Sequence, residues 1–215
     1  MNIYFLFFTL FRIVKYYLFS NYKRYLNLLV AILFCKPKNI LEIGVYNGKR
    51  ANEMIDASKI FNNKINYYGF DLFEKMNKKL LLKESSKHPS SKNEILKKLS
   101  KSNVNIKLFS GYTNKTLPMF IKKKIKVDFV FIDGGHSIRT IRHDWKNISK
   151  LMTKNTVVIL DDYYENNEKI VKKFGCNKVV KKINKKYYKI SKLPNVDRIK
   201  LKNLDIRMIK ITKNQ

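Results

Sequence analysis

The sequence predicts an α/β fold with a mostly parallel sheet, and two observations support that prediction. Short apolar runs alternate with segments of helical character from residue 39 onward, which is typical of β-α-β units. Several of these runs are continuously apolar, as in 129–132 and 156–160, and strands of this composition are usually buried on both faces of a sheet. With 215 residues, of which 45% are hydrophobic, the chain can form one domain with a sizeable core.

Each predicted strand is a short run rich in Val, Ile, Phe or Tyr that ends at a polar residue or a glycine. In chain order these runs cover residues 39–44, 65–70, 104–109, 127–132, 156–160 and 178–183. Two further runs, at 187–190 and 206–212, are expected to close the sheet as an antiparallel pair.

The predicted helices fill the intervals between the strands. One begins at Asn47-Gly48 and runs to about residue 59, and residues 75–102 form a Lys-rich insert of helix, loop and helix. Such an insert often covers substrate, although a solvated, charged insert has the same composition. Further helices are expected around 117–121 and at 138–151 and 165–174.

Residues 1–36 form an apolar, aromatic N-terminal helical segment, and residues 37–215 form the domain that contains the sheet. Arg12 and Lys15 interrupt the first apolar run, and each costs roughly 2.5–3.5 kcal/mol at the centre of a bilayer. The uninterrupted stretch is therefore too short to span a membrane. No small-residue cleavage site follows it, which argues against a cleaved signal peptide.

Two roles stay open for residues 1–20: packing in a homo-oligomer and peripheral contact with a membrane. In the second role Lys15, Lys23 and Arg24 are placed to meet anionic lipid. Residues 25–35 are expected to pack in the core instead.

The formal net charge is +30, from 39 Lys and 7 Arg (46 together) against 16 Asp and Glu. Lys, Asn and Ile have AT-rich codons, so a biased genome accounts for much of this excess. Arg, which binds phosphate through paired hydrogen bonds and stacks on bases, is scarce. The composition thus speaks against a nucleic-acid partner and favours a small-molecule partner that carries negative charge.

The two cysteines, Cys35 and Cys176, lie far apart in the sequence and outside any CxxC spacing. A disulfide framework or a structural zinc site is therefore not expected. Reduced thiols predict a cytoplasmic protein, held at the inner face of the membrane if residues 1–20 bind lipid.

Five of the sixteen acids stand at the ends of predicted strands: Glu42, Asp71, Asp133, Asp161 and Asp162. In an acid-poor chain this placement is not explained by composition. Because ligands of open α/β sheets bind beyond the carboxyl ends of the strands, we expect Asp133, Asp161 and Asp162 to face one crevice.

The first strand runs into a turn of the form acid-x-Gly-x-x-x-Gly, made by Glu42, Gly44 and Gly48. Gly44 lets the backbone turn tightly close to a ligand, and Gly48 precedes a helix N-terminus, which favours negative charge. Asp71 ends the second strand, where an acid hydrogen-bonds ribose hydroxyls in nucleotide-binding folds. The second glycine of a dinucleotide fingerprint is missing, and so is a Walker lysine motif.

Four segments carry a resemblance to a known family: Ile40–Gly44, Tyr68–Asp71, Phe131–Ser137 and Asp161–Tyr163. Over residues 37–212 the chain resembles the class I S-adenosylmethionine-dependent methyltransferases, and within them the small-molecule O-methyltransferases of the macrocin O-methyltransferase type. The resemblance implies a Rossmann-like three-layer sandwich with a seven-stranded, mostly parallel sheet whose last strand is antiparallel.

The resemblance also implies roles for individual residues. The cofactor S-adenosylmethionine would be bound along the carboxyl edge by Glu42, Gly44, Gly48, Asp71, Ser110, Gly111 and Asp133. Within this set the glycine turn would hold the methionine part, Asp71 the ribose, and the Ser110-Gly111 turn would lie near adenine. Asp133, Asp161 and Asp162 would hold Mg²⁺, a cation that prefers oxygen ligands.

The reaction expected from this resemblance is the magnesium-assisted O-methylation of a hydroxylated small molecule, such as a sugar or a glycan precursor. The metal would lower the pKa of one of two neighbouring hydroxyls, and either His136 or Asp133 would remove its proton. Two alternatives stay open. The charge favours an RNA methyltransferase, and the aromatic N-terminus favours a non-catalytic, membrane-associated protein that keeps the cofactor fold.

Overall fold

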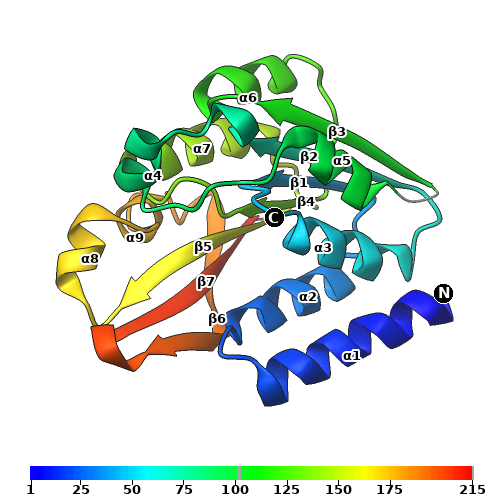
Figure 1. Ribbon diagram of the computed structural model, residues 1–215, viewed down its shortest axis with the longest axis horizontal. Helices are drawn as coiled ribbons and strands as arrows, with labels where there is room; N and C mark the ends of the chain where they lie inside the picture. The colour runs from blue at the N-terminus through cyan, green and yellow to red at the C-terminus, as the bar shows by residue number, and fades with distance from the viewer. Residues whose placement is uncertain (101–102, 215) are drawn as a thin grey trace.

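The sheet has seven strands in the order β3-β2-β1-β4-β5-β7-β6 in the computed structural model, which describes residues 1–100 and 103–214 (Figure 1). The strands are β1 (Asn39–Ile43), β2 (Ile65–Asp71), β3 (Val104–Ser110), β4 (Phe129–Ile132), β5 (Val157–Glu165), β6 (Tyr188–Ile199) and β7 (Leu204–Lys213). Strands β1 to β5 pair in parallel, whereas β7 is antiparallel to both β5 and β6. The predicted fold class is confirmed, including its antiparallel last strand.

The strand order reverses between β1 and β4. From β1 the chain moves outward through β2 to β3, and it then returns to place β4 on the other side of β1. Ile43 at the end of β1 pairs with both Phe70 and Ile132, so these three strands end at one edge. A crevice forms beyond the carboxyl ends of parallel strands where the order reverses in this way.

Helices cover both faces of the sheet. They are α1 (Ile3–Phe19), α2 (Arg24–Cys35), α3 (Lys49–Lys59), α4 (Lys78–Glu84), α5 (Lys92–Leu99), α6 (Thr113–Ile121), α7 (Ile138–Leu151), α8 (Glu168–Lys173) and α9 (Asn177–Val180), with short 3₁₀ turns at Phe73–Lys75 and Lys200–Lys202. Apolar side chains of α2, α3 and α5 pack on one face, and those of α6, α7 and α9 pack on the other.

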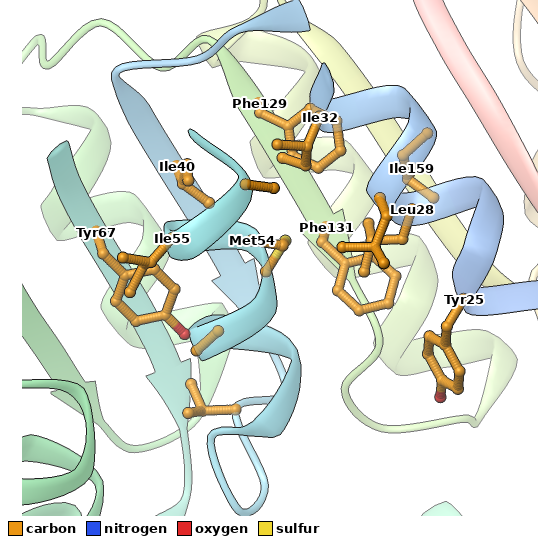
Figure 2. Packing of buried hydrophobic residues seen from close by; sticks show 14 of the residues in the cluster. Tyr25, Leu28, Ile32, Ile40, Met54, Ile55, Tyr67, Phe129, Phe131 and Ile159 are labelled. Carbon is orange, nitrogen blue, oxygen red and sulfur yellow. The ribbon is translucent and has the colours of Figure 1, made fainter. Parts of the chain in front are cut away.

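Helix α2 is part of the core. Its buried residues include Leu28 and Ile32, whose spacing places both on the side of the helix that faces the sheet. Figure 2 shows these two side chains beside Phe131 and Phe129 of β4, which have no exposed surface. Residues 25–35 therefore pack in the core, as expected from the sequence.

Helix α1 lies outside α2 and α3 and is the outermost helix on its side of the molecule (Figure 1). The Asn2 side chain accepts a hydrogen bond from the Phe5 amide and caps the start of the helix. Of the helices in the described ranges, none combines the length and the apolar character needed to cross a bilayer.

The predicted strand at 178–183 is wrong, because this segment forms the end of α9 and a following turn. The run contains Val179 and Val180, which favour strands, but its buried residues are Val179 and Ile183. These two are four residues apart, which is the spacing of a helix face rather than a strand.

Three other boundaries differ from the expected ones. β5 continues past the acid pair to Glu165 because β7 pairs with it again at Tyr163, after a change of register. The helix predicted at 165–174 consequently begins only at Glu168, and β6 extends to Ile199 rather than stopping at residue 190. Residues 101–102, which end the predicted insert, lie outside the described residues.

Candidate active site

A cavity of about 1170 Å³ opens at the carboxyl edge of the sheet. Strand ends and the turns after them line it with Gly44, Asp71, Gly111, Asp133 and Asp162. The insert between β2 and β3 contributes Glu84, Ser85 and Pro89 among other lining residues. The insert therefore lies over the site, which favours its interpretation as a cover over that of a solvated loop.

Asp133, His136 and Asp162 meet at one point of this cavity. One potential ligand atom from each residue lies within 4.8 Å of the other two. His136 Nε2 lies 3.2 Å from Asp162 Oδ2. Asp133 follows β4 and Asp162 lies in β5, two adjacent parallel strands, so the sheet itself brings these carboxylates together. This trio can bind a divalent cation or move a proton.

The imidazole of His136 is oriented from its other side. Its Nδ1 lies 3.0 Å from the main-chain oxygen of Ser85, and a carbonyl oxygen only accepts hydrogen bonds. Nδ1 must therefore carry a proton, and Nε2 of a neutral His136 is an acceptor that can face the Asp162 carboxylate only with a proton or a cation between them. Helix α4 holds the adjacent backbone as well, because the His136 amide donates to the Glu84 main-chain oxygen at 3.2 Å. A histidine fixed in this way is suited to bind a metal or to accept a proton.

Asp161 makes a different set of contacts from its neighbour Asp162. Both of its carboxylate oxygens accept from Arg24 Nε, at 2.9 and 3.1 Å, and Oδ1 also accepts from the Asp162 amide at 2.8 Å. The same guanidinium pairs with Asp197 of β6, whose Oδ1 accepts from the Arg24 amide at 2.8 Å. The structure thus brings Asp133 and Asp162 together with His136, whereas Asp161 is paired with Arg24. The assignment of all three aspartates to a metal site stays a prediction.

Crowding of carboxylates shifts their proton affinities. Burial, followed by the negative charges of Asp161 and Asp162, raises the pKa of Asp133 well above its usual range. Burial also raises the pKa of Asp162, and a protonated His136 opposes that rise. Burial contributes most to both shifts and the neighbouring negative charges add to them, so a cation at this point would be stabilised by the same carboxylates.

The turn after β1 lies in close contact with the main chain that follows β4. Gly44 has φ +92°, and a Cβ at this position would lie 2.0 Å from the Asp133 main-chain oxygen, so only glycine fits here. Gly48 also has a positive φ of +72°, but its neighbour is the Ile95 side chain of α5, at 3.1 Å from an added Cβ. Gly44 therefore lines the cavity, and Gly48 shapes the start of α3.

Asp71 fastens this turn to the end of β2. Its Oδ2 accepts from the Tyr46 amide at 2.8 Å, and its Oδ1 accepts from the Leu72 amide at 2.6 Å. Burial raises the pKa of Asp71, while these backbone donors oppose the rise. A carboxylate offers about four acceptor positions, so Asp71 keeps acceptor capacity toward the cavity that it lines.

Two predicted cofactor residues make contacts with the protein instead of with the cavity. Glu42 has no exposed surface, and the Tyr67 hydroxyl donates to its Oε2. Burial raises the pKa of Glu42 to about 8. Ser110 donates from its hydroxyl to the Leu72 main-chain oxygen at 3.4 Å, whereas the following Gly111 lines the cavity. The predicted roles of Glu42 and Ser110 as cofactor ligands therefore remain predictions.

The sequence interpretation missed the contribution of α2. Arg24, expected to face lipid, is 8% exposed and binds Asp161 inside the protein. Tyr25 lines the cavity, and its hydroxyl lies 3.5 Å from Asp133 Oδ2. One feature could have pointed to Arg24: it is one of seven arginines and stands at the start of an apolar run, where an unpaired charge would be costly.

The residues at the carboxyl edge fit the two groups that the resemblance implies. Gly44 and Asp71 both line the cavity, and the remaining acceptor capacity of Asp71 suits the hydroxyls of a nucleotide-derived ligand. The donor set of two carboxylates and one imidazole suits a divalent cation. The nitrogen donor extends the choice from Mg²⁺ to Mn²⁺ or another first-row metal.

Comparison with known proteins agrees with this geometry. Residues 41–163 match the sequence model of a family described as a methyltransferase domain. This segment contains the end of β1, all of β2 to β4, most of β5 and the Asp133, His136 and Asp162 cluster. No curated protein sequence matches the chain.

Solved structures with a similar fold include three methyltransferases. An O-methyltransferase from Bacillus cereus in complex with SAH has a TM-score of 0.58 and 17% identity, covering 86% of this chain and 79% of that one. TomG from Streptomyces achromogenes, an O-methyltransferase of tomaymycin synthesis in complex with SAM, gives 0.55 and 13%, covering 87% and 79%. SAH-bound PaMTH1 from Podospora anserina gives 0.54 and 17%, covering 87% and 76%. At these identities the likeness concerns the fold.

Proposed function

The chain belongs to the methyltransferase-domain family, and on that premise we propose that it transfers a methyl group from S-adenosylmethionine to a hydroxyl oxygen of a small molecule. The observation that carries the proposal is the meeting of Asp133, His136 and Asp162 beside the Gly44 turn, at the edge where the strand order reverses. Nucleotide-derived ligands bind at this edge in open α/β sheets. S-adenosylmethionine would lie along Gly44, Asp71 and Gly111, with its methyl group toward the trio.

The trio supplies two functions that O-methylation needs. Asp133 and Asp162 would hold a divalent cation, Mg²⁺ or Mn²⁺, which lowers the pKa of a bound hydroxyl. His136 Nε2 accepts the hydroxyl proton, and Asp162 at 3.2 Å stabilises the imidazolium that results. Nε2 has a single lone pair, so it can either accept the hydroxyl proton or coordinate the cation. His136 is therefore either the base or the third ligand. Asp133 takes the proton in the second case.

The group transfer itself requires little from the side chains beyond position. The acceptor oxygen attacks the methyl carbon in line with the sulfonium sulfur, the new C–O bond forms, and the C–S bond breaks. The sulfur keeps the electron pair and leaves as a neutral thioether, S-adenosylhomocysteine. The hydroxyl proton ends on the base. Holding the two substrates in line accounts for much of the rate in reactions of this type.

The cavity walls indicate an acceptor that carries hydroxyls and negative charge. Lys83, Lys87, Arg139 and Lys202 line the cavity together with its acids. Vicinal hydroxyls suit a site that combines a cation with a base, and basic side chains suit a phosphate or carboxylate on the same molecule. A sugar or glycan precursor with an anionic group satisfies both requirements.

The test is release of S-adenosylhomocysteine from S-adenosylmethionine with a panel of anionic sugars, in the presence of Mg²⁺, Mn²⁺ or a chelator. We expect turnover that depends on the acceptor and stops with the chelator. If His136 is the base, His136→Asn should lower kcat strongly, because the asparagine side chain cannot take up the hydroxyl proton. Unchanged turnover with the chelator would refute the cation, and turnover on RNA alone would refute the small-molecule acceptor.

A further inference from the structure

Helix α1 presents its apolar side chains to solvent. Ile3, Phe7, Phe11 and Leu18, which recur at helical spacing along one face, are 76%, 66%, 60% and 59% exposed. Further exposed apolar residues flank this stripe, so that about half of the helix circumference is apolar and uncovered. Contiguous apolar surface of this kind is rare on proteins unless it contacts something.

Apart from the exposed Lys15, the polar side chains of α1 face the protein. Arg12 pairs with Asp56 of α3 at 2.8 Å, and the Tyr16 hydroxyl donates to Glu53 of α3 at 2.9 Å. Thr9 has no exposed surface. Ile13 and Tyr16 also pack against the core, so the inward side of α1 combines polar and apolar contacts while its outward side is apolar too. These contacts hold the inward side of the helix on the protein, and packing within this chain does not explain its outward apolar face.

Charge decides between the candidate occupants of this face. Residues 1–41 contain six basic residues and no acid, and the chain as a whole has a formal net charge of +30. A second copy packed on the same face would bring two such segments together without carboxylates to neutralise them. The surface of a membrane that contains anionic lipid supplies both an apolar interior for the phenylalanines and negative charge for the lysines.

From this exposed apolar face and the positive charge around it we infer that the outward face of α1 docks on the surface of an anionic membrane. The helix lies in the interface, with Phe7 and Phe11 toward the acyl chains and Lys15 at the level of the headgroups. It does not cross the bilayer, because no described helix is long and apolar enough to do so. This surface is independent of the carboxyl-edge cavity, so its test does not require turnover.

The test is flotation of the full chain with phosphatidylcholine vesicles, with and without phosphatidylserine. Phe7→Glu/Phe11→Glu removes the apolar face, and Met119→Glu/Tyr187→Glu, at exposed apolar positions on α6 and before β6, is the matched control. Both double variants lower the net charge equally, so a difference between them reflects where the substitutions lie and not the net charge of the chain. Circular dichroism and thermal unfolding verify that each variant is folded.

We expect the wild type and the control to float with vesicles that contain phosphatidylserine, and the α1 variant to bind at least ten-fold more weakly. Two results would overturn the inference at once: equal flotation of the two variants, or no flotation of the wild type. A third result that would overturn the inference can come from sedimentation velocity. A wild-type dimer that Phe7→Glu/Phe11→Glu converts to a monomer would make a second copy of the chain the occupant of this face.

Discussion

The carboxyl edge of the sheet and helix α1 depart from the usual distribution of side chains in opposite directions. At the edge, Asp161 and Asp162 are buried although the chain has few acids. On α1, Phe7 and Phe11 are exposed although large apolar side chains are among those most often buried. Each arrangement costs free energy in the isolated chain, and each is understandable if a ligand or surface completes it.

The two regions differ in how the structure compensates that cost. The buried acids are paired inside the protein with Arg24, with backbone amides and with His136. Nothing within the described residues covers the outward apolar face of α1. The regions meet at the turn between α1 and α2, where Tyr22 lines the cavity and Arg24 reaches Asp161. The carboxyl edge is thus preorganised by contacts within the chain, whereas the outward face of α1 has no partner within it.

The largest effect is expected from neutralising an acid of the preorganised region. Asp162→Asn removes the carboxylate that faces both His136 and the cation position, so kcat should fall by about 10²–10⁴-fold. The affinity for S-adenosylmethionine should stay unchanged, because the position we propose for the cofactor is on the Asp71 side. Initial rates of S-adenosylhomocysteine release measure the loss.

The matched control for this loss is Glu168→Gln, an exposed acid later in the same region of the chain. It should leave kcat within two-fold, and so should Phe7→Ser on α1 with a water-soluble acceptor. If the Phe7 variant lost as much activity as the Asp162 variant, the two regions would not be functionally separate.

The second effect compares two arginines that anchor the two regions. Arg24→Ala leaves Asp161 and Asp197 buried without their partner, and the free energy of unfolding should fall by about 3–5 kcal/mol. Arg12→Ala removes the partly exposed pair with Asp56 and should cost only about 1–2 kcal/mol. Urea unfolding measures both values, and equal losses would contradict the distinction between a preorganised site and a loosely held helix.

The third effect is a pH dependence caused by Glu42 beneath the site. Its pKa is about 8 in the folded chain because of burial, and about 4.3 in the unfolded chain. Between these two values the folded state binds the proton and the unfolded state does not, so unfolding releases a proton there. The free energy of unfolding therefore falls as pH rises, by about 1.4 kcal/mol per pH unit from this group, and levels off above the folded pKa.

Glu42→Gln isolates that contribution because glutamine keeps an acceptor for the Tyr67 hydroxyl. Urea unfolding of both proteins from pH 5.5 to 8 should show the variant gaining stability relative to the wild type as pH rises. Parallel curves would mean that Glu42 is ionised throughout, and that the floor of the site holds an additional negative charge.

The smallest effect is expected on the outward face of α1. Phe11→Ala should change the free energy of unfolding by less than about 0.5 kcal/mol, because its side chain makes few contacts that folding creates. The same substitution at Phe131, which has no exposed surface, should cost about 3–5 kcal/mol. Denaturation of the two variants in the absence of lipid provides the comparison, and a large loss at Phe11 would show that α1 is covered in solution.

The parallel half of the fold could be predicted because its strands are continuous apolar runs that end in acid. β4 and the beginning of β5 follow that pattern, and helix α7 matches the predicted 138–151 at both ends. The C-terminal part was harder, since α9 is a short helix made of residues that favour strands. Its conformation is decided by which of them are buried, and that depends on tertiary contacts with α7 and β5.

The site could be predicted in its location and only partly in its contacts. Strand ends place Asp71, Asp133 and Asp162 around the cavity, as the sequence indicates. The pairing of Asp161 with Arg24 joins residues more than a hundred positions apart, and spacing along the chain carries no information on such a contact. The same holds for the Ser85 carbonyl that orients His136.

The central claim is that the carboxyl edge binds S-adenosylmethionine, and calorimetric titration of this cofactor tests it most directly. The wild type should bind one equivalent saturably, and Asp71→Asn, which keeps one acceptor for the backbone but loses the charge, should bind at least ten-fold more weakly. Glu168→Gln should bind like the wild type. Absence of binding by the wild type, or equal affinity of the Asp71 variant, would contradict the account.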